Sequence, residues 1–248
     1  MRSRILVTLT TVLAIATTLA LTGSVVGPTG TSDASPGRYQ WRADLDAAST
    51  AIPTKAQPTV QSTTKSLLRA GASNTKATAV AAGSTECDGC SGTATTLQVV
   101  YFDGSGTASA DNVANAISLC PQCATGPATA AVSVQVVIAR RADQLIVNNR
   151  AFAVNANCDG GCEANAAAVQ FVLVGGSRKD LSAASKDLIG QLQDALAGKL
   201  VATAGQPSAQ ARASAEGATA SIADQLQGVL AKDTGSTTVQ RNVDVQVG

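Results

Sequence analysis

Residues 123–137, CATGPATAAVSVQVV, decide the fold class, because apolar and polar side chains alternate in them after a cysteine and a turn. The apolar side chains share one side of an extended chain and the polar ones share the other: Val132, Val134 and Val136 against Ser133 and Gln135. This period of two is typical of a half-buried β-strand. The segment is therefore expected to be one strand of a sheet, preceded by a cysteine-bearing turn.

The same unit occurs three times. Its first part matches (T/N)-x-A-x-A-(V/I) at starting points 37 residues apart: Thr75, Asn112 and Asn149. Each copy then reaches a pair of cysteines: Cys87 and Cys90, Cys120 and Cys123, Cys158 and Cys162. A second strand-like segment follows each pair and carries a glutamine: Gln98, Gln135 and Gln170. Such self-similarity predicts a repeat domain over 74–176, with modules at 75–101, 112–138 and 149–174.

Each module is predicted to be a strand, a cysteine-bearing turn and a second strand. Turn residues also join the modules, at 103–106 and 140–143. Two arrangements fit this pattern: a three-module antiparallel stack of β-hairpins, or the coils of a β-solenoid. Alanines recur in the first strand of every module although alanine is a poor strand former, so a closely packed, buried face is expected there.

The region 177–248 differs from the repeats. Ser177 and Asp180 have the spacing of a helix capping box, and apolar residues then recur at helical spacing to Leu196. A second amphipathic helix is expected over about 209–231, followed by a strand from Thr237 in which valines alternate with polar residues. The predicted fold class is therefore α+β: a three-module β repeat, two amphipathic helices and a C-terminal strand.

The N-terminal part of the chain resembles an export signal. Arg2 and Arg4 precede an uncharged run from Ile5 to Leu21, so residues 1–27 are expected to be a signal peptide, either cleaved or kept as a membrane anchor. Residues 28–73 are rich in Ser, Thr, Pro and Ala without a sustained period, and are expected to be a flexible spacer. The body of the protein is therefore expected outside the cytoplasm, secreted or anchored at its N-terminus.

The composition excludes several classes of function. The 248 residues include no histidine, so Ser-His-Asp and Cys-His nucleophiles and histidine metal sites are excluded. A net charge of +1 and only 2% aromatic residues oppose nucleic-acid binding. We expect no catalytic residue, no metal site, no cofactor and no nucleic-acid partner.

Three uses of the cysteines compete. An even number of cysteines in an exported chain favours structural disulfides, formed within or between modules. Two Cys-x-x-Cys pairs could instead hold zinc through four thiolates. The CPQC pair, Cys120 and Cys123, could serve as a redox-active dithiol, since it lacks the acidic neighbours of the other two pairs.

The repeated glutamines and the Asp-Gly turns each have a structural interpretation. Side-chain amides of Gln98, Gln135 and Gln170 are expected to form a ladder, meaning a row of hydrogen bonds between equivalent positions of successive modules. The alternative is an internal Cys-Gln thioester. Asp88, Asp103 and Asp159 precede glycines as ordinary turn residues rather than as calcium ligands, because no twelve-residue binding loop is present.

At these residues the sequence resembles a group of actinobacterial exported proteins that repeat a cysteine pair followed by small residues and Gln-(V/F)-V. Some members are labelled putative peptide zinc metalloproteases. The resemblance covers CSGTATTLQVV from Cys90, CATGPATAAVSVQVV from Cys123 and CEANAAAVQFVLVGG from Cys162, with the helix that follows. It implies an exported repeat domain of no established activity; the His-Glu-x-x-His motif that the protease label requires is absent.

Together these features predict an exported, non-enzymatic structural or binding protein of the cell envelope or extracellular space, stabilised by disulfides. Its partner would be a protein or envelope component, and a membrane would be contacted only through an uncleaved N-terminal anchor. The alternatives are an extracytoplasmic thiol-disulfide oxidoreductase that uses CPQC, and a zinc-binding module ligated by cysteines.

Overall fold

The computed structural model describes residues 32–33, 44–72, 74–121, 123–156, 158, 161–177, 180–202, 208–236 and 238–248. The signal segment predicted over 1–27 lies outside these residues, as do residues 28–31, 34–43 and 73 of the predicted spacer.

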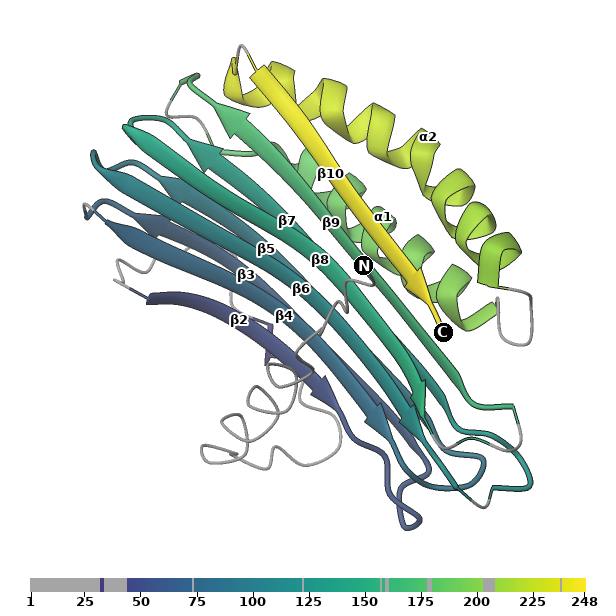
Figure 1. Ribbon diagram of the computed structural model, residues 1–248. Helices are drawn as coiled ribbons and strands as arrows, with labels where there is room; N and C mark the ends of the chain where they lie inside the picture. The colour runs from purple at the N-terminus through teal and green to yellow at the C-terminus, as the bar shows by residue number, and fades with distance from the viewer. Residues whose placement is uncertain are drawn as a thin grey trace, which may run out of the picture. The chain divides into compact units, whose positions relative to one another are not determined.

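Successive strands alternate between two sheets (Figure 1). One sheet, called sheet B, has the order β2 (Asp44–Ala51), β4 (Thr75–Thr85), β6 (Thr107–Leu119) and β8 (Gln144–Ala156). The other, called sheet A, has the order β1 (Ser32–Asp33), β3 (Thr59–Ala70), β5 (Ser91–Phe102), β7 (Ala128–Ala139), β9 (Glu163–Val174) and β10 (Thr238–Val247). Neighbouring strands are parallel in both sheets, except that β10 runs antiparallel to β9.

The chain therefore forms a β-solenoid, the second of the two arrangements that the repeats allow. A coil consists of one strand of sheet B, an arc, and the following strand of sheet A. The predicted strand, turn and strand of each module are present, but its two strands lie in different sheets and bond to the equivalent strands of the neighbouring modules. The antiparallel hairpin stack is thus not formed, because each cysteine-bearing arc crosses from one sheet to the other.

A fourth coil precedes the three predicted ones and corrects the predicted spacer. Within residues 28–73, β2 and β3 add to the sheets parallel to β4 and β5, and Leu45 and Leu68 are buried. The arc of this coil lacks cysteines; Thr54 and Gln57 close it through two backbone hydrogen bonds of 3.0 Å. The outward-facing residues of β3 are mostly polar because no helix covers them in the described part of the chain. The sequence of this coil therefore lacks the run of apolar residues that marks the strands of the later coils.

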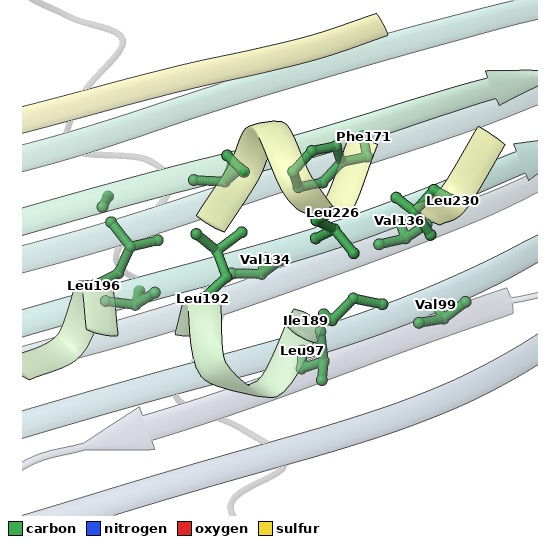
Figure 2. Close-up of a cluster of buried hydrophobic side chains, with 14 of the residues drawn as sticks. Leu97, Val99, Val134, Val136, Phe171, Ile189, Leu192, Leu196, Leu226 and Leu230 are labelled. Atoms are coloured by element: carbon green, nitrogen blue, oxygen red, sulfur yellow. The ribbon is translucent and has the colours of Figure 1, made fainter. Parts of the chain in front are cut away.

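The central strands of sheet A are buried on both faces, whereas a half-buried strand was expected. On β5, β7 and β9 the apolar side chains face helices α1 (Ala183–Ala202) and α2 (Ser208–Thr234), and the glutamine side faces sheet B. Figure 2 shows Val134 and Phe171 of the sheet packed with Leu192, Leu196 and Leu226 of the helices. The alternation remains because each face has its own kind of partner: helices on one side and a second sheet on the other.

The space between the sheets is filled mainly by alanine and small polar residues. Ala77, Ala79 and Ala81 of β4 and Ala110 and Ala114 of β6 are all fully buried there. The prediction of a closely packed alanine face is therefore correct. Gly83 belongs to the same face, and a Cβ at this position would lie 2.5 Å from the Thr129 methyl group, so glycine alone fits here without a shift of Thr129.

The C-terminal region has the predicted two helices and final strand, with one difference in capping. Helix α1 begins at Ala183, and the Ser182 hydroxyl accepts the Ser185 backbone N–H at 3.2 Å, so Ser182 and not Ser177 caps the helix. Ser177 instead donates its backbone N–H to the Thr234 carbonyl at the end of α2. This contact joins the end of the repeat domain to the end of the helical region.

Candidate functional site

Three disulfides close the arcs of the three cysteine-bearing coils. Cys87 pairs with Cys90, Cys120 with Cys123 and Cys158 with Cys162, with Cα–Cα distances of 5.4, 5.5 and 5.7 Å. These distances suit unstrained backbone positions for a disulfide. Each bond lies within its own module, so the disulfides fix the arcs locally and do not cross-link the coils to one another.

Backbone and aspartate hydrogen bonds join successive arcs instead. The Gly89 N–H donates to the Thr125 carbonyl at 2.8 Å, and the Thr125 N–H donates to Asp88 Oδ1 at 2.7 Å. Gly89 has a φ of +64°, a left-handed conformation that glycine adopts without steric cost. Asp88 therefore acts as a turn residue that orients the next arc, while Asp159 lies outside the described residues.

The three glutamines form a continuous row in the interior between the sheets. Gln135 Nε2 donates to Gln98 Oε1 at 2.6 Å, and Gln170 Nε2 donates to Gln135 Oε1 at 2.7 Å. The amides also donate to backbone carbonyls of sheet B: Gln98 to that of Leu45 at 2.8 Å, Gln135 to that of Asp111 at 3.2 Å and Gln170 to that of Ala110 at 3.2 Å. All three side chains are fully buried, so this row holds the two sheets together as well as the coils.

A second polar row, which the sequence analysis did not identify, faces the glutamines from sheet B. Asn112 Nδ2 donates to Asn149 Oδ1 at 2.7 Å and to the Ser133 and Val169 carbonyls at 3.1 Å. The Ser133 hydroxyl donates to Asn112 Oδ1 at 2.6 Å. The available signal was the identical residue at the start of the second and third modules, which marked a repeat position without revealing that it points inward.

A third polar cluster lies near the cysteine-bearing arcs. Ser118 Oγ is 2.8 Å from Thr129 Oγ1 and 3.1 Å from Thr85 Oγ1, and it donates to the Glu163 carbonyl at 2.6 Å. All three hydroxyl-bearing residues are buried. The interior is therefore polar along much of its length, and its hydroxyl and amide groups are largely satisfied by one another and by backbone carbonyls.

A charged cluster fixes the opposite end of the coils, where β5 and β7 end. Arg140 and Arg69 bind Asp103 at 3.0 and 3.4 Å, and both guanidinium groups lie about 5 Å from the ring of Tyr101. The Tyr101 hydroxyl accepts the Leu181 backbone N–H at 3.0 Å, and burial raises the pKa of this phenol above its ordinary value. The cluster positions the segment that enters α1.

The burial and pairing of the cysteines bear on their alternative uses. Both sulfur-bearing residues of CPQC are buried, with 6% exposure at Cys120 and 8% at Cys123, whereas a redox-active thiol has to be reached by its substrate. Among the residues that the structure describes, no three His, Cys, Asp or Glu side chains gather to hold a metal ion. With every cysteine paired and every ladder glutamine hydrogen-bonded to its neighbours, the Cys-Gln thioester is not formed.

A small cavity lies between sheet A and the end of α1. Its volume is about 20 Å³, and its lining includes Thr129, Asn165 and Leu200. Asn165 Nδ2 donates to the Leu200 carbonyl at 2.9 Å, while its buried Oδ1 has no partner. A space of this size holds one water molecule and is too small for a metabolite.

The outer face of sheet B is exposed along all four of its strands. Figure 1 and the packing of both helices on sheet A leave this face without a covering element among the described residues. Apolar side chains run across it, with 45% exposure at Phe152 and 43% at Ile146, beside the half-buried Val80, Val113 and Ile117. Parallel sheets normally have both faces covered, so this exposed face is the best candidate for a binding surface.

Charges on this face are few and partly paired. Lys76 Nζ lies 3.0 Å from Asp111 Oδ2, and Asn148 Nδ2 donates to Asp111 Oδ1 at 2.8 Å. Burial alone would raise the pKa of Asp111, but the Asn148 amide, the Lys76 ammonium and the more weakly acting Arg150 charge together outweigh it, so the pKa lies below its ordinary value. Asp46 on β2 and Arg150 on β8 are exposed at the two lateral edges of the face.

Comparison with known proteins identifies no relative. No family model matches the chain, and no curated protein or solved structure matches it either. Within the described part of the chain, neither helix combines the length and apolar character needed to cross a bilayer. The function is therefore inferred from the residues and their arrangement.

Proposed function

We propose that the protein is an exported, non-enzymatic structural or binding protein of the cell envelope or extracellular space. One observation carries the proposal: all six cysteines form disulfides, each closing the arc of its own coil. Disulfides of this structural kind persist in oxidising compartments outside the cytoplasm. The charged and apolar N-terminal segment and the resemblance to exported repeat proteins support the same location.

The arrangement suits a scaffold better than an enzyme. The buried polar rows fix the register of the coils, and helices α1 and α2 cover sheet A with an extensive apolar core. The outer face of sheet B is the surface that such a scaffold leaves free for a partner. Binding on this face needs no rearrangement of the chain, because its side chains already project from a hydrogen-bonded sheet.

Counting thiols on the exported protein tests the proposal. The chain is recovered from an oxidising compartment, unfolded, and treated with an alkylating reagent, and its intact mass is compared with that of a reduced sample. We expect no alkyl groups before reduction and six after it, with peptide mapping that pairs cysteines within modules. Bound zinc, a readily reduced CPQC bond or activity in insulin reduction would contradict the scaffold and favour one of the alternative uses.

A further inference from the structure

The outer face of sheet B has a composition that complements itself. Its four strands are in register, so outward side chains form rows across the sheet: Ala48, Val80, Val113 and Arg150 in one, and Thr50, Ala82, Asn115 and Phe152 in the next. In both rows the residue on β2 is small and the residue on β8 is large: Ala48 against Arg150, and Thr50 against Phe152. The acidic Asp46 lies on β2, at the opposite lateral edge from Arg150 on β8.

We propose that this face binds the same face of a second copy of the chain, around a two-fold axis parallel to the strands. Such an axis places β2 on the partner's β8 and β4 on the partner's β6, with each row facing the same row. Ala48 then faces Arg150 of the partner subunit, Thr50 faces Phe152 of the partner subunit, and Ser84 faces Ile117 of the partner subunit. At these three positions a small side chain meets a large one, as interdigitating sheets require.

The same axis brings opposite charges together at both edges. Asp46 lies one row from Ala48, so its carboxylate comes within reach of the long side chain of Arg150 of the partner subunit. The two-fold symmetry repeats this pair on the other edge. A two-fold axis across the strands would instead set β8 on the partner's β8 and bring the two Arg150 guanidinium groups close together, which disfavours that arrangement.

The size of the face is sufficient for a specific dimer. Four strands spaced about 4.8 Å apart, each contributing about ten residues of 3.3 Å, give roughly 600 Å² per copy and about 1,200 Å² for the pair, the lower limit for specific interfaces. Lys76 and Asp111 neutralise each other within one copy, so no unpaired charge lies between the central strands. Dimer formation would also give sheet B the covered second face that parallel sheets normally have.

Reciprocal charge reversal tests the pairing. In Asp46→Arg, both edge contacts become Arg against Arg; in Arg150→Asp, both become Asp against Asp. We expect sedimentation equilibrium of the full chain to show a wild-type dimer, at least tenfold weaker self-association for each variant, and recovery of a dimer containing one chain of each kind when the two variants are mixed. Recovery is expected because every edge contact in the mixed dimer again joins an arginine to an aspartate.

The control and the opposing outcomes are equally specific. Lys65→Asp makes the same change of charge as Arg150→Asp on an exposed residue of β3, on the outer face of sheet A, and should leave association unchanged. Asp46, Lys65 and Arg150 are all exposed, so each variant is expected to retain the fold. Circular dichroism checks this expectation. A wild-type chain that stays monomeric, single variants that associate as the wild type does, or a mixture no tighter than its components would each overturn the proposal.

Discussion

Replacing Gln135 with methionine removes the central member of the glutamine row while keeping a long, unbranched side chain. Gln135 donates to Gln98 at 2.6 Å and to the Asp111 carbonyl at 3.2 Å, and it accepts from Gln170 at 2.7 Å. Without it, the buried Gln98 Oε1 loses the donor that the row gives it. One orphaned buried acceptor and the lost hydrogen bonds together should cost about 2–4 kcal/mol of unfolding free energy.

Urea unfolding of the oxidised protein measures this cost through the transition midpoint and slope. The exposed Gln61, replaced in the same way, is the control and should change stability by less than about 0.5 kcal/mol. Replacing all three row glutamines together should cost less than the sum of the three single changes, because no amide is then left facing a missing partner. A loss below about 0.5 kcal/mol for Gln135→Met, or full additivity in the triple variant, would refute a coupled row.

Three further predictions concern the arcs and helix termini. Replacing Cys87 and Cys90 with serine should cost about 2 kcal/mol, the entropy of so short a loop, and leave the other two disulfides intact by peptide mapping. Asp233→Asn should destabilise the protein by about 1.5–3 kcal/mol at neutral pH, because the carboxylate accepts Ser182 N–H and Ser185 O–H at 2.7 and 2.6 Å. Burial alone would raise the pKa of Asp233, but the hydrogen bonds from these serines hold it below its ordinary value. The wild type should therefore be more stable than Asp233→Asn above about pH 5, and unfolding measurements should show this difference vanish as the pH falls through the pKa of Asp233 in the folded protein. Gly126→Ala should destabilise by about 1–3 kcal/mol in thermal unfolding, because the added Cβ would overlap the Gly161 backbone, whereas Gly190→Ala in α1 meets no neighbour and should stabilise slightly.

The repeat and its turns could be predicted from sequence because they depend on local spacing. Gln98, Gln135 and Gln170 occupy one register row, as their equivalent positions in the modules indicate. The first-strand alignment was less accurate: Asn112 pairs with Asn149 as expected, but Thr75 pairs with Ala108. The arc between β6 and β7 is longer than the arc between β4 and β5. Residues 37 positions apart are therefore partners on β5 and β7 of sheet A, but not on β4 and β6 of sheet B.

What could not be predicted depends on contacts between distant segments. Alternation showed that Val134 and Gln135 lie on opposite faces, but it could not show that both faces are buried, since that requires the helices and sheet B. The first coil was missed because its arc has no cysteines and its outward residues, such as Gln61 and Lys65, resemble those of a solvated linker. The exposed face of sheet B could not be predicted because each of its rows combines residues about 32–37 positions apart in the chain. Ala48, Val80, Val113 and Arg150 form one such row.

The position of the helices at the end of the chain has a consequence for the order in which the molecule can fold. Each disulfide joins cysteines only three or four residues apart, so an arc can oxidise as soon as it has been synthesised. The apolar face of sheet A, in contrast, is covered only in part by α1 and stays incomplete until Leu226 and Leu230 of α2 are available (Figure 2). Arc formation is thus a local event and core formation a final one, and a chain that stops before α2 would carry correct disulfides on an incomplete, aggregation-prone sheet.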